Sequence, residues 1–251
     1  MAVARPSLEN EFSSAESLRQ LRDWLEQELS PRPLPTKEVL EGLLPGNLDL
    51  KQVEATLIEA AGPPDYAVLD FFLDRALRRD YDLDSMEPSS AEALADVLDL
   101  WTIVSGALGQ IDFARKHAEQ ALKATSERRK RQHVLFTLAA ACLAANRADE
   151  SPDVRIGMAL SALRRAKRMG APAHLLAHNR GSVELIAGAW SAFSVGRRMR
   201  HLRRAVRLLK QASDSPDLEP EQREKVAIEV GQATAAWAEL RKLPWHVRWL
   251  G

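Results

Sequence analysis

The sequence has one cysteine, few aromatic residues and no long uncharged apolar segment, and each shortage excludes a class of protein. Cys142 has no second cysteine to pair with, which excludes a scaffold held together by internal disulfides. The longest uncharged apolar run, Val134–Ala145, is well short of the roughly 20 residues that a membrane-spanning helix needs. The N-terminal residues resemble neither a secretory nor an organellar signal, so we expect a cytoplasmic protein.

Motifs for nucleotide and metal chemistry are also missing. Neither G-x-x-x-x-G-K-[ST] nor G-x-G-x-x-G occurs, which argues against a nucleotide-dependent enzyme. His174 and His178 are four residues apart on a predicted helix, but the glutamate of H-E-x-x-H is absent. Ordinary surface histidines are the simpler interpretation, and we expect no cofactor and no metal.

Three further candidates for chemistry have simpler structural interpretations. Asp80, Asp82 and Asp84 imitate the first ligands of a calcium loop, but the glycine and the bidentate glutamate of that loop are missing. Cys142 lies among alanines and leucines, where burial would make its thiol inert. Glu184 interrupts an apolar run, and we expect it to face solvent or to pair with Arg180, one helical turn earlier. The sequence therefore predicts a protein that is not an enzyme.

The chain is instead rich in helical patterning. Its 251 residues, 45% of them hydrophobic, can bury a core without staples. Apolar residues recur at spacings of three and four between proline and glycine breaks, and two-residue alternation is nearly absent, so we predict an all-α fold. The expected helices cover residues 14–29, 36–44, 48–61, 65–80, 90–109, 112–125, 129–146, 152–169, 172–195, 197–213 and 219–243.

Residues that punctuate helices support these boundaries. Ser89-Ser90 resembles an N-cap, and Gly170 lies where a helix C-terminus favours a left-handed residue. Pro152, Pro172 and Pro220 occupy predicted first turns.

Proline-rich segments suggest where the chain divides. Ser30–Pro35 and Met86–Pro88 are the best linker candidates because proline resists helix formation. We therefore expect an acidic N-terminal helical region, residues 1–87, and a helical-hairpin domain with a C-terminal capping helix, residues 88–251.

The net charge of zero hides a strong asymmetry. Residues 1–112 contain 22 Asp and Glu against 9 Lys and Arg, whereas residues 113–251 contain 13 against 26. Such asymmetry indicates a surface for nucleic acid, for an acidic partner or for self-association, although charged faces can also be merely solvated. The acidic first third of the chain could itself cover the basic surface.

One stretch resembles a known repeat family. In GQIDFARKHAEQAL, residues 109–122, a glycine turn precedes Ala114, Ala118 and Ala121 at helical spacing. This resembles the second helix of a tetratricopeptide (TPR) repeat, in which small residues let neighbouring helices pack closely. Leu98 and Trp101 fit the first helix of that repeat, and the match covers one repeat, residues 95–128.

Similar alanine pairs occur in two later predicted helices. Alanines seven residues apart occur three times, at intervals of 45 and 46 residues: Ala114 and Ala121, Ala159 and Ala166, Ala205 and Ala212. The spacing predicts three successive helical hairpins, longer than TPR units and closer to HEAT-like lengths. The resemblance implies a right-handed solenoid whose curved surface serves as a non-enzymatic scaffold or adaptor for another protein.

Arginines and tryptophans are the candidate partner-binding residues. Basic clusters at 128–131, 164–168 and 197–210 could follow a phosphate backbone, so a nucleic-acid-associated protein is the alternative function. Aromatic residues of the basic region all fall on apolar stripes, so no base-stacking platform is expected. The candidates are Arg128, Arg129, Arg131, Arg164, Arg165, Arg168, Arg197, Arg200, Arg203, Arg204, Arg207, Trp245 and Trp249. Trp245 and Trp249 could anchor a partner or could close the core.

Overall fold

The protein is all-helical wherever its structure is described. The computed structural model describes residues 6, 12–30, 64–77, 83–145 and 148–244. Within these ranges the chain forms nine α-helices and no strand, which confirms the predicted all-α class. The helices are α1 (Ala15–Leu29), α4 (Tyr66–Ala76), α5 (Pro88–Ala107), α6 (Ile111–Ala124), α7 (Arg128–Ala144), α8 (Pro152–Arg168), α9 (Ala173–Ala189), α10 (Val195–Ser213) and α11 (Pro220–Lys242).

Several predictions lie outside the described ranges. These are the helices at 36–44 and 48–61, most of the proline-rich linker, Asp80 and Asp82, and both Trp245 and Trp249. In the part of the chain that is described, no helix combines the length and apolar character that crossing a membrane requires.

Most predicted helix ends lie within a few residues of the observed ones, with two corrections. Helix α5 begins at Pro88 with Glu87 as its N-cap, so the Ser89-Ser90 cap was wrong: proline itself occupies the first turn. Helix α9 ends at Ala189 and does not continue to Val195. The chain turns there because the Ser194 hydroxyl accepts the Arg197 N–H and starts α10.

The left-handed turns fall at glycines. Gly170 has φ of 73°, as predicted for the end of α8, and Gly109 has φ of 78° between α5 and α6. Glycine adopts this conformation without the steric cost that other residues incur. Both turns reverse the chain between consecutive packed helices.

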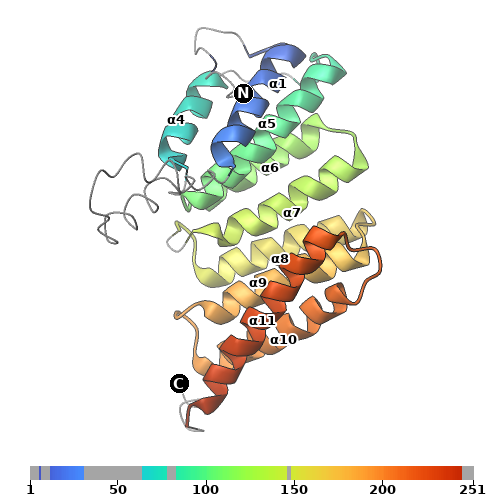
Figure 1. The fold of residues 1–251 in the computed structure, drawn as a ribbon. Helices are drawn as coiled ribbons and strands as arrows, with labels where there is room; N and C mark the ends of the chain where they lie inside the picture. The colour runs from blue at the N-terminus through green and yellow to red at the C-terminus, as the bar shows by residue number, and fades with distance from the viewer. Residues whose placement is uncertain (1–5, 7–11, 31–63, 78–82, 146–147, 245–251) are drawn as a thin grey trace, which may run out of the picture.

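Helices α5 to α10 follow one another in chain order along one long axis, and α11 runs obliquely across the lower helices in this view (Figure 1). Helix α5 packs on α6, α7 on α8, and α9 on α10, and α7 also contacts both α5 and α9. Helices α1 and α4 pack on α5, and one hydrophobic core extends from Phe12 to Phe193, on both sides of residue 87. Helix α11 packs mainly on α10, with fewer contacts to α9, and buries only Val226 and Ala233.

The alanine pattern has the predicted consequence. Ala114 and Ala121 on α6, Ala159 and Ala166 on α8, and Ala205 and Ala212 on α10 are all fully buried. Small side chains at these positions let each helix approach its neighbours closely. Glycine has the same role on α9, where a Cβ at Gly181 would lie 2.7 Å from Leu209 and one at Gly188 would lie 2.5 Å from Leu202.

Candidate functional site

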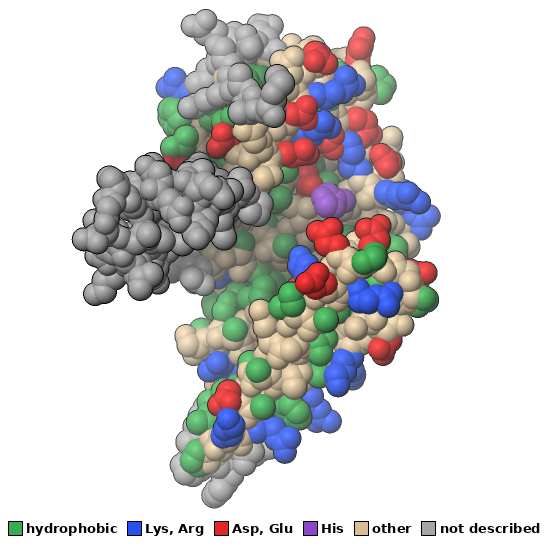
Figure 2. All heavy atoms as spheres, in the orientation of Figure 1, with side chains coloured by type: hydrophobic (Ala, Val, Ile, Leu, Met, Phe, Trp, Pro, Cys, Tyr) green, Lys and Arg blue, Asp and Glu red, His purple; other side chains and the backbone are tan. Residues whose placement is uncertain are grey.

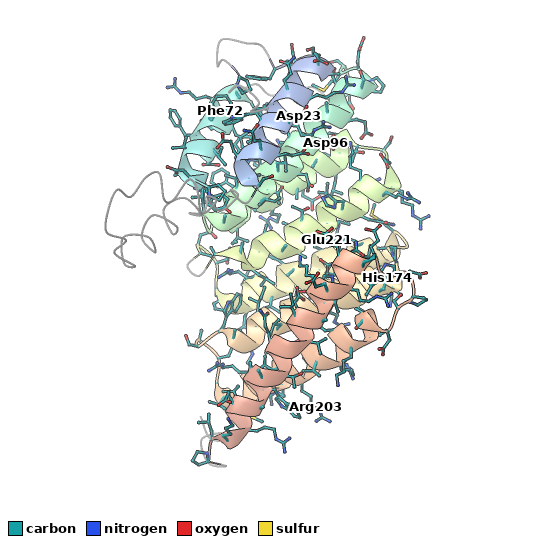
Figure 3. All side chains as sticks on the ribbon, in the orientation of Figure 1. Asp23, Phe72, Asp96, His174, Arg203 and Glu221 are labelled. Atoms are coloured by element: carbon teal, nitrogen blue, oxygen red, sulfur yellow. The ribbon has the colours of Figure 1, made fainter. Side chains whose placement is uncertain are left out.

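The first basic cluster, at the start of α7, is largely neutralised by the acidic side of α5. Lys130 Nζ lies 2.7 Å from Asp96 Oδ1 and 3.2 Å from Glu92 Oε2, and Arg22 of α1 reaches Asp96 at 3.7 Å. Burial would lower the pKa of Lys130, but the two carboxylates raise it further than burial lowers it. Asp96 is labelled on α5 in Figure 3. Carboxylates of α5, the helix before α6 in the chain, thus neutralise part of this basic cluster.

The arginines of the same cluster do not form an open ridge. Arg128 Nε donates to the Met169 carbonyl at 2.5 Å, and the half-buried Arg131 has an Nε without a hydrogen-bond partner among the described residues. Gln132 donates to the same carbonyl at 2.9 Å, so this end of α7 caps the C-terminus of α8. Arg129 alone of the candidates here is exposed without a partner among the described residues. Two of the four cations at 128–131, Lys130 and Arg128, are thus already paired with carboxylate or carbonyl oxygens.

The cluster on α8 divides into one paired and three unpaired cations. Arg165 makes a bidentate ion pair with Glu119 of α6, which lowers the pKa of Glu119 through hydrogen bonding to its carboxylate. Arg164, Lys167 and Arg168 are exposed and have no hydrogen bond or ion pair to any described residue.

Helix α10 shows the same division. Arg197 pairs with Asp153 and lies over the Phe193 ring, 3.8 Å from its centroid, and Arg198 donates to the Gly188 carbonyl at 3.0 Å. Arg204 lies 4.0 Å from Glu184. The remaining cations, Arg200, Arg203, Arg207 and Lys210, are exposed and make no hydrogen bond or ion pair with the described residues.

Basic side chains gather at one end of the molecule (Figure 2). Arg203 points away from the ribbon in Figure 3. Figure 2 shows mixed acidic and basic side chains over α1 and α5, but mainly Lys and Arg along the lower edge beside α10. Unpaired guanidinium groups on a surface raise the local concentration of anionic ligands. We use the name basic face for the exposed, unpaired cations of α8, α9 and α10, which are Arg164, Lys167, Arg168, Arg180, Arg200, Arg203, Arg207 and Lys210.

Glu184 does not pair with Arg180, which corrects the sequence-based expectation. Its Oε2 lies 2.6 Å from His201 Nδ1 of α10, and both side chains are buried. Phe193 stacks on the His201 ring at 5.7 Å. Because α9 and α10 pack closely, the hydrogen-bond partner of Glu184 is His201 on α10 and not Arg180 on its own helix. Glu184 and His201 therefore hold two helices together and face no open site.

His174 and His178 also contact carboxylates. His174 Nδ1 lies 3.9 Å from Asp217, and His178 Nε2 lies 3.3 Å from Glu229 Oε2 on α11. Burial would raise the pKa of Glu229, but the His178 ring and the Ser182 hydroxyl, which donates at 2.6 Å, lower it overall. No cluster of three or more His, Cys, Asp or Glu in the described ranges is arranged to hold a metal ion. The two histidines connect α9 to α11 and to the segment that precedes α11.

A hollow between α8, α9 and α10 was not foreseen from the sequence. It has a volume of about 310 Å³. Apolar residues form much of its wall: Leu160 and Leu163 from α8, Ala173, Leu176 and Ala177 from α9, and Leu208 from α10. Arg164, Lys167 and Arg180 stand around these apolar residues, together with Gln211. A shared spacing could have indicated it, because residues of α8 and α9 line it at positions i, i+3, i+4 and i+7.

Aromatic exposure differs in one place from the prediction. Phe113 on α6 is 54% exposed, not packed on an apolar stripe, and its ring lies 6.4 Å from that of His117. Phe193 is buried, and Phe136 and Trp190 are half-buried, as expected of residues on apolar stripes. Phe113 is the one strongly exposed aromatic residue that the structure describes in the basic region.

Arg155 is a buried cation that sequence patterning did not single out. It is 3% exposed and donates to the carbonyls of Cys142, at 2.7 Å, and of Ala145, at 2.5 Å. Its guanidinium lies 4.7 Å from the Trp190 ring centroid. Cys142 is buried as predicted, and burial raises the pKa of its thiol to about 11, which leaves it unreactive.

No family model, curated protein or solved structure matches this chain. The functional conclusion therefore depends on the geometry and charge of its own residues.

Proposed function

We propose that the protein is a non-enzymatic interaction scaffold, a solenoid of stacked helical hairpins similar to TPR proteins, whose basic face binds an acidic segment of a partner protein. The observation that carries this proposal is the division of the arginines. Those that serve the fold have carboxylate or carbonyl partners, whereas a group on α8, α9 and α10 has none in the described structure. Solvation alone does not require such a concentration of unpaired cations on neighbouring helices.

The packing order supports a solenoid of hairpins. Each helix from α5 to α10 packs mainly on its neighbours in the chain, which is typical of repeat proteins. Contacts of α7 with α5 and α9 are more extensive than those of α8 with α6 and α10. A stack with this imbalance curves, with α5, α7 and α9 on its inner side and α6, α8 and α10 on its outer side.

Two observations favour a protein partner over nucleic acid. The three basic clusters are interrupted by pairs such as Arg165 with Glu119 and Arg197 with Asp153, so the free cations do not continue along the whole stack. The strongly exposed aromatic residue described in the basic half of the chain, residues 113–251, is Phe113, which lies on α6 and not among the free cations of α8, α9 and α10. Proteins that bind single strands combine a basic groove with stacking platforms.

A charge-reversal experiment tests the proposal. Fluorescein-labelled poly-L-glutamate and labelled single- and double-stranded DNA are titrated by anisotropy at about 50 and 200 mM salt. The variant replaces Arg200, Arg203 and Arg207 with Glu. The matched control carries the same three reversals at Arg115, Lys116 and Lys123, which are exposed on α6.

We expect the α10 variant to weaken poly-L-glutamate binding by at least about tenfold, and the control to change it much less, because both alter the net charge equally. Equal losses in the two variants would mean that only total charge matters. DNA binding that is tighter than poly-L-glutamate binding, and lost with the α10 reversals, would replace the proposal with the nucleic-acid alternative.

A further inference from the structure

The hollow between α8, α9 and α10 combines a charged rim with an apolar wall. Its α8 residues, Leu160, Leu163, Arg164 and Lys167, follow the same helical register as Ala173, Leu176, Ala177 and Arg180 on α9. On each helix, these positions lie on one stripe, which begins with an apolar residue and ends with a cation, Lys167 on α8 and Arg180 on α9. Its volume, about 310 Å³, is at the small end of the range of ligand sites. It suits one large side chain and a neighbouring group better than a cofactor.

The cations of the rim have no ion-pair partner in the part of the chain that the structure describes. Arg164, Lys167 and Arg180 are exposed, make no hydrogen bond or ion pair with the described residues, and no carboxylate lines the hollow. By contrast, Arg165, which follows Arg164 in the chain, forms an ion pair with Glu119. The three cations of the rim are therefore available to anionic groups of a ligand.

The start of α9 adds to the positive potential. Ala173 is the first residue of this helix and lines the hollow, and the N-cap Pro172 provides no side-chain hydrogen bond. The first amides of a helix lack partners within the helix and carry its positive partial charge. Anionic groups at the hollow are thus attracted from α8 and from both the first turn and the body of α9.

The apolar wall specifies the other half of the ligand. Leu160, Leu176 and Leu208 are only half-buried, although they come from three helices that pack together. Covering their exposed surfaces with an apolar group would be favourable because it removes more of them from water. Binding of a fully hydrated anion would leave these leucine surfaces in contact with water.

Resting on the proposed function, we propose that this hollow is the specificity pocket of the scaffold, which takes one Leu or Phe side chain of an acidic partner segment while flanking carboxylates bind Arg164, Lys167 and Arg180. The polar rim fixes the position of the segment, and the apolar wall selects its central residue. The rest of the basic face attracts the segment without selecting it.

Labelled peptides of constant charge test the pocket. Each probe is about 15 residues long, a length that spans the hollow with both flanks. It consists of Glu, Asp and Gly with a single central Leu, Phe or Ser. Anisotropy is measured with wild-type protein, with Ala173→Trp, which fills the hollow from an exposed position, and with the combined Arg164→Ala and Arg180→Ala variant. Ala140→Trp, also at an exposed alanine, is the matched control.

We expect the Leu and Phe peptides to bind about ten- to a hundredfold tighter than the Ser peptide, as burial of one such side chain implies. Ala173→Trp should remove the preference and Ala140→Trp should keep it. The double arginine variant should weaken all three peptides.

Three results would overturn the pocket. Equal binding of the Leu, Phe and Ser peptides, with poly-L-glutamate still dependent on Arg200, Arg203 and Arg207, would refute the pocket and leave the proposed function standing. Failure of the peptides and of poly-L-glutamate together would refute both. Displacement of the Leu peptide by micromolar dodecanoate, with the Ser peptide binding as tightly as the Leu peptide, would assign the hollow to a lipid carboxylate.

Discussion

His117 on α6 should make the stability of the fold depend on pH near neutrality. The ring is 5% exposed, stacks on Trp101 with 3.9 Å between ring centroids, and lies with Nδ1 3.2 Å from the Ser105 hydroxyl. Trp101 is itself held by Asp70, which accepts its Nε1–H at 2.7 Å. Burial lowers the pKa of His117 to about 4, with a smaller effect from Lys116.

The sign and size follow from linkage. An unfolded chain protonates this histidine near pH 6.5, so between about pH 6.5 and pH 4 the unfolded state binds more protons than the folded state. The stability contributed by His117 is therefore fully present above pH 6.5 and is lost as the pH falls towards 4. From pH 7 to pH 5 this single ring should lower the free energy of unfolding by about 2 kcal/mol.

Urea unfolding followed by far-ultraviolet circular dichroism measures this quantity at a series of pH values. We expect the wild type to lose about 2 kcal/mol more than His117→Gln between pH 7 and pH 5. His133→Gln is the matched control with the opposite sign, because a hydrogen bond to Asp99 raises the pKa of His133. Its removal should steepen the loss on acidification. Parallel pH profiles for wild type and His117→Gln would refute the reasoning.

Other predictions follow from single contacts. Arg155→Met should cost about 3 kcal/mol in urea unfolding, because two charge-assisted hydrogen bonds to buried carbonyls disappear; a loss below about 1 kcal/mol would contradict this. Gly181→Ala should lower the free energy of unfolding by about 1 to 3 kcal/mol because the new Cβ would meet Leu209. Gly231→Ala, which has open space around it, should raise the free energy of unfolding by up to about 1 kcal/mol. Equal effects of the two substitutions would be inconsistent with close packing of α9 on α10. Cys142 should resist a thiol reagent in the native protein and react in urea, and rapid native labelling would show that it is not buried.

Local patterning was enough to predict the helices that the structure describes and their close-packed faces. Apolar spacing, proline and glycine act within a few residues of each other, so the all-α class and the left-handed Gly170 could be read directly. The alanines seven residues apart are buried as their spacing required, because side-chain volume limits how closely helices approach. The turn after Ala189 was missed because it depends on Ser194 beginning a new helix.

Partners that come from other helices could not be predicted in this way. Glu184 was assigned to its neighbour on the same helix, but tertiary packing brings His201 to 2.6 Å. The same limit applies to the arginines. The sequence places Arg164 and Arg165 in one basic cluster. Only the fold shows that Arg165 pairs with Glu119, whereas Arg164 lies at the hollow. A charge cluster defines a candidate surface, and packing decides which of its members remain free.

Hydrogen exchange of the whole protein with and without poly-L-glutamate tests the central claim most directly. If the basic face binds acidic protein segments, slowed exchange should be concentrated in α8, α9 and α10 and should disappear when Arg200, Arg203 and Arg207 are replaced with Glu. Protection that falls on α5 and α6 instead, or that survives these replacements, would contradict the account.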